Sequence, residues 1–231
     1  MCDINEIYIK VTKNGPYIIY GAPPVVRKKI LSDENGVCIG FSEGENFEIK
    51  SNPIALCRCG CTKTPPFCDN SHHENNFDGT ESASFEPILN NAVKYVGKNL
   101  ILYDNENYCA LARFCDANGS IWNLIYEGSE EADNEVKRQA ALCPSGRLII
   151  FDKNGNVIEP RLDKMISVLE DNGLKISGPI YVQGGIKVVS ENGESYEIRN
   201  RQTLCRCGKS KNKPFCDCTH KHVKFKAKNN D

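Results

Sequence analysis

Short apolar runs and alternating positions mark the first quarter of the chain as β-rich. Residues 7–11 alternate between apolar and polar side chains, residues 17–20 are almost entirely apolar, and apolar residues return over 25–31. Both patterns are typical of β-strands. Turn-forming residues separate them at Asn14-Gly15-Pro16 and at Glu34-Asn35-Gly36. The pattern predicts a small domain of strands joined by tight turns.

The same succession of features returns in the last third of the chain. Leu174–Ile176 precedes a predicted turn at Gly178-Pro179, and strands are predicted at Ile180–Val182 and Ile186–Val189. The first copy has extra residues ahead of its cysteine motif, so the two copies are expected to differ there. For Leu162–Leu169, just before the second copy, a helical turn and a loop fit the pattern equally well.

The segment between the copies, about residues 80–160, has a different pattern. Strands are predicted at Leu100–Tyr103, Ser120–Tyr126 and Arg147–Phe151, and a hairpin turn at Asn154-Gly155. Ser129–Leu142 predicts a helix, because the serine can cap it and acidic residues fill its first turn. We therefore expect an α+β insert between two β-rich repeats.

Each β-rich repeat leads into the same spacing of potential metal ligands, C-x-C-x8-C-x3-H. The four positions are Cys57, Cys59, Cys68 and His72 in the first copy, and Cys205, Cys207, Cys216 and His220 in the second. The chain has only four histidines, and two of them occupy the same place in the two motifs. The repeated spacing indicates two metal sites, each with three thiols and one imidazole.

The spacing also narrows the choice of metal. Structural zinc sites usually use cysteine pairs separated by two to four residues, whereas these pairs are separated by one. Imidazoles replace thiolates on one iron of Rieske clusters. A Cys3His set thus suits a two-iron cluster, with two thiolates on one iron and a thiolate plus the imidazole on the other. A zinc-stapled interaction module is the alternative.

The motif resembles that of the CDGSH iron–sulfur domain (NEET) family, C-x-C-x2-(S/T)-x3-P-x-C-D-G-(S/A/T)-H. Asn70 and Cys218 stand where the family has glycine, and at a positive φ asparagine is tolerated better than cysteine. Asp69 and Asp217, each next to a motif cysteine, are expected to cap the following turn. The resemblance implies two 2Fe–2S clusters. Single-motif members of the family form homodimers, so it also implies that the two copies pack together within one chain as a pseudo-dimer.

Three cysteines of the insert, Cys109, Cys115 and Cys143, form a second candidate site. A cysteine followed by proline closes the motif of bacterial-type ferredoxins, and Pro144 follows Cys143. C-x5-C with Cys-Pro-Ser-Gly-Arg-Leu resembles the divergent single-cluster ferredoxin-like domain. Three thiolates fit a 3Fe–4S cluster, or a 4Fe–4S cluster completed by oxygen with Asp116 as the nearest candidate. The alternative is that these cysteines only pack in a core.

Charge and composition exclude several classes of function. The 231 residues carry a formal charge of −1, which gives no electrostatic footprint for nucleic acid or an anionic membrane. No apolar run approaches the roughly 20 residues of a membrane helix, and the first residues do not resemble a signal peptide. We therefore expect a cytoplasmic protein. In that reducing compartment, an odd number of cysteines, 13, favours metal ligation over disulfides.

Some residues of the same types receive no metal-binding role. No partner is predicted for Cys2, Cys38, Cys61 and Cys218, although Cys38 has the surroundings of a small buried apolar residue. His73 and His222 are expected to be exposed neighbours of the motif histidines. Lys221–Lys228 alternates and predicts an edge strand with a charged outer face.

The sequence thus predicts a mostly β protein with an α+β insert, divided into an N-terminal CDGSH domain (1–80), a ferredoxin-like cluster domain (81–160) and a C-terminal CDGSH domain (161–231). The expected function is electron transfer, and cluster storage or transfer is the alternative. No nucleophile–base pair, phosphate loop or dinucleotide fingerprint is present, so no enzyme is expected. The expected partners are redox proteins or apo-protein cluster acceptors, with the chain itself a monomer.

Overall fold

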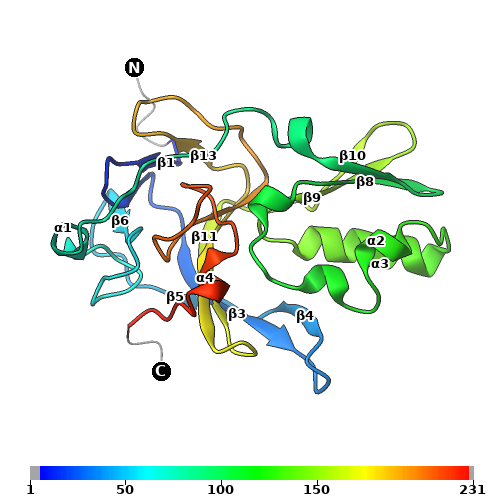
Figure 1. Cartoon of the computed structure of the whole chain (residues 1–231), viewed down its shortest axis with the longest axis horizontal. Coiled ribbons are helices and arrows are strands. Elements are labelled where there is room, and N and C mark those ends of the chain that lie inside the picture. The colour runs from blue at the N-terminus through cyan, green and yellow to red at the C-terminus, as the bar shows by residue number, and fades with distance from the viewer. Residues whose placement is uncertain (1–5, 229–231) are drawn as a thin grey trace.

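A computed structural model describes residues 6–228 of the protein and is mostly β (Figure 1). Its strands are β1 (Tyr8–Val11), β2 (Tyr17–Tyr20), β3 (Val25–Ser32), β4 (Cys38–Phe41), β5 (Glu45–Asn46), β6 (Ile54–Leu56), β7 (Val93–Val96), β8 (Leu100–Asp104), β9 (Leu148–Asp152), β10 (Val157–Ile158), β11 (Met165–Asp171), β12 (Ile176–Gln183), β13 (Lys187–Val189) and β14 (Arg201–Leu204). The α-helices are α1 (Ser71–Glu74), α2 (Ile121–Leu124), α3 (Glu130–Leu142) and α4 (Thr219–His222), with 3-10 turns η1 (Ile88–Asn91), η2 (Glu106–Tyr108) and η3 (Phe114–Asp116).

The two repeats exchange strands. One sheet has the order β13-β1-β2-β6, and another has the order β14-β12-β11-β3-β4, with β5 on β3. The two exchanged strands pair in parallel, with Tyr8 opposite Lys187 in one sheet and Ile166 opposite Val25 in the other. Figure 1 shows β3 and β11 side by side, in blue and yellow. Because the exchange is reciprocal, the repeats form a pseudo-two-fold pair, and the predicted intrachain packing is confirmed.

One hydrophobic core lies beneath both exchanged sheets. Its buried members from the first repeat include Ile9, Val11, Tyr17, Ile19 and Leu56, and those from the second include Val168, Ile180, Val182, Val188 and Leu204. None of these side chains is more than 1% exposed. Neither repeat therefore encloses a core of its own, which is the physical reason for the pairing.

The insert builds a separate layer from the antiparallel sheet β10-β9-β8-β7 and helices α2 and α3. The predicted helix is confirmed, with the Ser129 hydroxyl accepting a 3.1 Å hydrogen bond from Ala132 N. The predicted strand at Ser120–Tyr126 is wrong, because this segment forms α2. Ile121 and Ile125 are both fully buried, and their i, i+4 spacing places them on one helical face against the insert's core. The β-branched composition had suggested a strand.

Two predictions around the second repeat also fail. The undecided Leu162–Leu169 segment contains most of β11, the partner of β3. The predicted Gly178-Pro179 turn lies inside β12, where the pairing with β11 shifts register between Val168 and Glu170. A bulge of this kind accommodates a proline that cannot donate to the ladder.

The predicted edge strand at Lys221–Lys228 is wrong as well. The segment starts in α4 and continues without strand pairing, although Ser177 N donates to Phe225 O at 2.8 Å and Ala227 N to Ser177 Oγ at 3.0 Å. The predicted turns at Asn14-Gly15-Pro16, Glu34-Asn35-Gly36 and Asn154-Gly155 are confirmed. The extra residues of the first repeat form β4 and β5, as the length difference suggested.

Candidate metal centres

The first motif forms a loop that begins directly after β6 and ends in α1. Cys57 N donates to Pro66 O at 2.8 Å and Cys68 N donates to Ala55 O at 2.9 Å, so the loop is held at both ends. The two thiols nearest the strand have their sulfur atoms 3.6 Å apart. At the other end of the loop, Cys68 Sγ lies 3.5 Å from His72 Nδ1. The four predicted residues are therefore brought together as two pairs.

The second motif repeats this arrangement between β14 and α4. Cys205 N donates to Pro214 O at 2.8 Å and Cys216 N to Thr203 O at 2.9 Å. The sulfur atoms of Cys205 and Cys207 are 3.7 Å apart, and Cys216 Sγ lies 3.4 Å from His220 Nδ1. The repeated spacing of the sequence thus produces a repeated geometry.

These pair distances match what a tetrahedral metal requires. Two sulfurs bound at about 2.3 Å to one tetrahedral ion lie about 3.8 Å apart, and a sulfur and an imidazole nitrogen lie about 3.6 Å apart. Among residues 6–228, no three Cys, His, Asp or Glu side chains are placed to hold a single ion. The donors are grouped two by two, and this grouping fits a cluster in which each pair binds a different metal atom.

The acidic residues of the motifs hold the loops in shape, as predicted. Asp69 accepts hydrogen bonds from Ser71 N at 3.0 Å and Lys63 N at 2.8 Å, and these backbone donors lower the pKa of its carboxyl well below the ordinary value. Asp217 makes the equivalent bonds in the second loop. The replaced glycine positions are left-handed, with φ at 68° for Asn70 and 72° for Cys218. Asparagine tolerates this conformation better than cysteine.

Backbone N–H groups and burial set the electrostatics of the ligands. Hydrogen bonds from Cys59 and from the backbone lower the pKa of Cys57 to about 6. The same arrangement lowers the pKa of Cys205 to about 7. Burial, together with the nearby Arg206 guanidinium, lowers the pKa of His220 to about 4. Burial also lowers the pKa of His72, with the neighbouring His73 as the second cause. Burial instead raises the pKa of Cys68 and Cys216. Cys57 and Cys205 are therefore shifted towards the anionic thiolate, and the two histidines towards neutral imidazole, which are the forms that bind metals.

In each motif the residue between the two paired cysteines in the sequence is a buried arginine. Arg58 donates to Thr12 O at 3.0 Å and also to Gly79 O, and it lies over the Tyr17 ring. Arg206 instead forms an ion pair with Glu170 at 2.7 Å, and both side chains are buried. Neither arginine was predicted to have a role, although the repeated Cys-Arg-Cys could have indicated one.

The two motif loops meet back to back on the pseudo-two-fold axis. A Cβ on Gly60 would lie 2.8 Å from Cys207 O, and a Cβ on Gly208 would lie 2.5 Å from Cys59 O. Both glycines have a positive φ, at 79° and 73°. The backbone of each loop therefore rests on a ligand residue of the other, and neither glycine can be replaced without a clash. Tyr17 adds a hydrogen bond from its hydroxyl to Cys205 O at 2.9 Å.

The three cysteines of the insert all interact electrostatically with one further side chain, Arg147. The thiols of Cys109, Cys143 and Cys115, with Asp104, raise the pKa of this guanidinium although burial opposes them. Arg147 is 6% exposed and forms an ion pair with Asp104 at 3.2 Å. Its Nη1 atom is buried and has no hydrogen-bond partner among the described residues. An anionic acceptor bound by these thiols could satisfy this donor, so the residues fit a negatively charged cluster.

The remaining cysteines and histidines follow the sequence predictions where they are described. Cys38 is buried, at 3% exposure, and packs with Phe114 of the insert. His73 and His222 are exposed. Cys61 and Cys218 are half-buried, and Cys2 lies outside the described residues.

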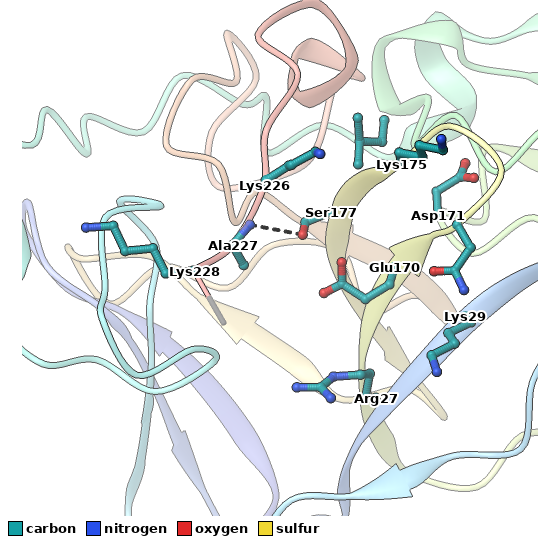
Figure 2. Close-up of a pocket in the computed structure, with 11 residues that line it drawn as sticks. Arg27, Lys29, Glu170, Asp171, Lys175, Ser177, Lys226, Ala227 and Lys228 are labelled. Carbon is teal, nitrogen blue, oxygen red and sulfur yellow. Dashed lines mark hydrogen bonds between the residues drawn. The ribbon is translucent and has the colours of Figure 1, made fainter. Parts of the chain in front are cut away.

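A cavity of about 670 Å³ is lined by several basic residues and by Glu170 and Asp171, and none of the predicted ligands lines it. Figure 2 shows Lys226 and the hydrogen bond from Ala227 N to Ser177 Oγ on one side, and Glu170 on β11 opposite them. Glu170 connects the cavity wall to Arg206 and so to the second motif. None of the helices between residues 6 and 228 is long and apolar enough to cross a membrane.

Comparison with known families agrees with this geometry. The family model described as iron-binding zinc finger CDGSH type matches residues 14–73 and 177–221, and the one described as divergent 4Fe-4S mono-cluster matches residues 95–153. No curated protein and no solved structure gave a match. Two exchanged β repeats with cysteine–histidine motifs, around an insert of this type, define an iron–sulfur protein. Two segments of the chain thus match the CDGSH family, and a divergent 4Fe-4S mono-cluster domain lies between them, which is a tandem CDGSH arrangement with a ferredoxin-like insert.

Proposed function

We propose that the protein is an electron carrier with a 2Fe–2S cluster in each repeat and a third cluster in the insert. The ligands would be Cys57, Cys59, Cys68 and His72 in the first repeat, Cys205, Cys207, Cys216 and His220 in the second, and Cys109, Cys115 and Cys143 in the insert. When bound, such clusters supply one-electron redox chemistry at potentials that depend on ligand type, burial and hydrogen bonds.

The observation that carries the proposal is the pairing of donors at 3.6 and 3.5 Å in the first repeat and 3.7 and 3.4 Å in the second. A single zinc ion would need all four donors around one point. Pairs at these separations instead suit two metal atoms per motif, each with two protein ligands. The proposal therefore favours a two-iron cluster over a zinc-stapled interaction module.

The protein's own residues would tune such a site. Backbone N–H groups of Gly60 and Thr62 point at Cys57, and those of Gly208 and Ser210 point at Cys205. Donors of this kind stabilise negative charge on sulfur and raise the reduction potential. The buried guanidinium of each Cys-Arg-Cys segment acts in the same direction. Neutral imidazoles at His72 and His220 carry one negative charge fewer than thiolates would, which also favours electron uptake.

Cluster transfer to apo-proteins is a second candidate function, and the first site favours it. Cys68 is half-buried, whereas its counterpart Cys216 is buried. An acceptor's thiols could approach the first site more closely than the second. In either role the partners would be other proteins, the chain would act as a monomer in the cytoplasm, and no catalytic reaction is proposed.

Metal analysis of anaerobically purified protein tests the class of cofactor. We expect iron and acid-labile sulfide, no stoichiometric zinc, and a red-brown colour, and colourless zinc protein would overturn the proposal. Cys143→Ser should remove the iron of the insert while the visible absorbance of both CDGSH sites is retained. Incubation with apo-ferredoxin distinguishes the two functions, because only a cluster-transfer protein would load it.

The role of the imidazole is tested by His220→Cys. Reduction adds negative charge and raises the basicity of the imidazole, so electron uptake should be coupled to proton uptake. The potential of the second site should then shift by up to about 59 mV per pH unit, and the variant should have a lower potential with almost no pH dependence. The first site serves as the internal control. An unaltered potential in the variant would mean that His220 is not a ligand.

A further inference from the structure

Three thiols leave a four-iron cluster one protein ligand short. Four cysteines normally hold a 4Fe–4S cluster, and the insert provides Cys109, Cys115 and Cys143. The nearest oxygen ligand in the sequence, Asp116, has an exposed side chain on η3. A fourth ligand from elsewhere in the fold would have to come from a segment packed against these cysteines.

The second CDGSH loop is such a segment. Asn212 Nδ2 of this loop donates to Asn107 O at 3.1 Å, two residues before Cys109. The rings of Tyr108 and Phe215 pack edge to face, with centroids 5.3 Å apart. These contacts join the chain beside Cys109 to the residues on either side of Pro214. In Figure 1 the red loop that ends in α4 lies against the green segment that contains η2.

The same repeat also holds the other end of the insert's site. Arg201, on β14, donates to Cys143 O at 2.8 Å, and Arg199 donates to Ser145 O at 3.3 Å. Both arginines are buried, at 2% and 9% exposure. The segment that carries Cys143 is therefore held against the second repeat by buried side chains.

Cys218 lies on the second loop, within this contact. Burial and the thiol of Cys109 raise its pKa, while Lys221 and Arg147 oppose the change. The Cys218 thiol thus interacts electrostatically with Cys109 and with the Arg147 guanidinium, in agreement with the contacts between this loop and the segment beside Cys109. Its backbone is left-handed, with φ at 72°. A cysteine in this conformation costs free energy that glycine or asparagine would avoid, and the first repeat has Asn70 at the equivalent position.

A buried guanidinium with an unpaired donor interacts electrostatically with all four thiols. Arg147 is only 6% exposed, and its Nη1 atom has no hydrogen-bond partner among residues 6–228. The guanidinium interacts with Cys109, Cys115 and Cys143 and also with Cys218. A buried cation with an unused donor among four thiols indicates a site for an anionic group.

We infer that Cys218 Sγ is the fourth ligand of a 4Fe–4S cluster shared between the insert and the second CDGSH loop, with Cys109, Cys115 and Cys143 as the other three. The inference rests on the proposed cluster of the insert. Cys218 would lose its proton to solvent as the sulfur–iron bond forms. Because Cys216 belongs to the second 2Fe–2S site, the Cα atoms that carry ligands of the two clusters would be at most about 7 Å apart. The second site and the insert would then be directly coupled for electron transfer.

The test is Cys218→Asn, which gives the second loop the residue of the first loop and removes the thiol without backbone strain. Protein purified anaerobically should contain about eight iron atoms per chain, and the variant about seven. The variant's central cluster should show the EPR signal of an oxidised 3Fe–4S cluster, which the parent protein lacks. Cys218→Gly should behave in the same way, and Asn70→Ser, at the equivalent position of the first loop, should leave the iron content unchanged.

The outcomes separate this inference from the proposed function. Four iron atoms per chain in the parent protein would mean that the insert binds no cluster, and this would overturn the inference. An intact 4Fe–4S spectrum in both Cys218 variants would keep the central cluster and overturn the inference, and loss of one iron in Asp116→Ala would then assign the oxygen ligand. A 3Fe–4S signal in the parent protein would overturn it too. In each variant, unchanged absorbance of the two CDGSH sites shows that the fold is intact.

Discussion

The two CDGSH sites have the same internal geometry and different surroundings. In each, a thiol pair and a thiol–imidazole pair are held at nearly the same distances, and an aspartate caps the same turn. The two sites differ in burial, since Cys216 is buried and its counterpart Cys68 is half-buried. The arginine of the second motif has a carboxylate partner, whereas that of the first motif bonds to carbonyl groups.

The comparison shows what a tandem gene allows that a homodimer does not. In a homodimer each substitution changes both sites at once. In the single chain, one site can be covered by the insert and acquire Glu170 and Cys218, while the other stays accessible. The loops still rest on each other through Gly60 and Gly208. The sites are therefore free to differ in their surroundings but not in the backbone that holds the ligands.

The largest difference between the sites should follow from Glu170→Gln. This change leaves the Arg206 guanidinium buried without its carboxylate, and breaking a buried pair in this way costs about 3–5 kcal/mol. At 2–4 °C per kcal/mol, the melting temperature should fall by roughly 10 °C, with the second cluster lost first. Circular dichroism on heating and visible absorbance measure the two effects.

The matched control for this change is Glu45→Gln. Glu45 pairs with Lys29 at 3.4 Å on an exposed surface, where such pairs contribute less than about 1 kcal/mol. Equal losses in the two variants would show that the Arg206–Glu170 pair is not a special feature of the second site.

The shared axis should make Gly208→Ala harmful to both sites. The added Cβ would lie 2.5 Å from Cys59 O, a backbone atom of the first motif. Overpacking and the left-handed φ together should cost about 2–4 kcal/mol. Visible circular dichroism of both CDGSH clusters should change. Gly193→Ala also has a positive φ, but nothing lies within 4 Å of its Cβ, so it measures the backbone strain alone. Damage confined to the second site would argue against coupling across the axis.

The smallest expected difference is in acid lability. Burial and Arg206 lower the pKa of His220 from an ordinary value of 6.5 to about 4. Its imidazole therefore stays neutral as the pH falls between these two values. At His72 burial lowers the pKa without an arginine among the causes. The first cluster should therefore be lost severalfold faster than the second at pH 5, which can be measured as absorbance decay in Cys207→Ser and Cys59→Ser respectively. Faster loss from the second site would contradict this.

The same pKa shift bears on the stability of the fold. A histidine whose pKa is lowered by folding contributes stability that is present above its ordinary pKa and lost as the pH falls through the folded value. For His220 the window runs from 6.5 down to about 4. The stability of the second repeat should decline over that range.

Features that depend on residues close together in the sequence could be predicted from it. The motif spacing indicated the two pairs of donors, the family's glycine indicated the left-handed φ of Asn70 and Cys218, and Ser129 indicated the start of α3. The ligand roles themselves stay predictions until metal is measured.

Features that depend on distant residues could not be read from the sequence. Pro179 suggested a turn, yet it lies within β12, where a bulge in the pairing with β11 accommodates it: two β12 residues, Gly178 and Pro179, lie opposite the single β11 residue Leu169. Ile121 and Ile125 suggested a strand, and the packing of α2 against α3 decides for a helix. Cys218 had no predicted partner, because the residues of the insert with which it interacts electrostatically, Cys109 and Arg147, are 109 and 71 residues away in the sequence.

The exchange of β3 and β13 has a consequence for the order in which the chain can fold during synthesis. β1 finds its parallel partner only in β13, and β3 finds its own only in β11, so the first repeat leaves the ribosome with two unpaired edges. The insert needs only its own hairpins, β7–β8 and β9–β10, and their antiparallel contact. Non-local pairing forms slowly, and domains normally fold in the order of their synthesis. Here the insert is the first part able to fold. The N-terminal repeat can complete its strand pairing only after the C-terminal repeat has been synthesised.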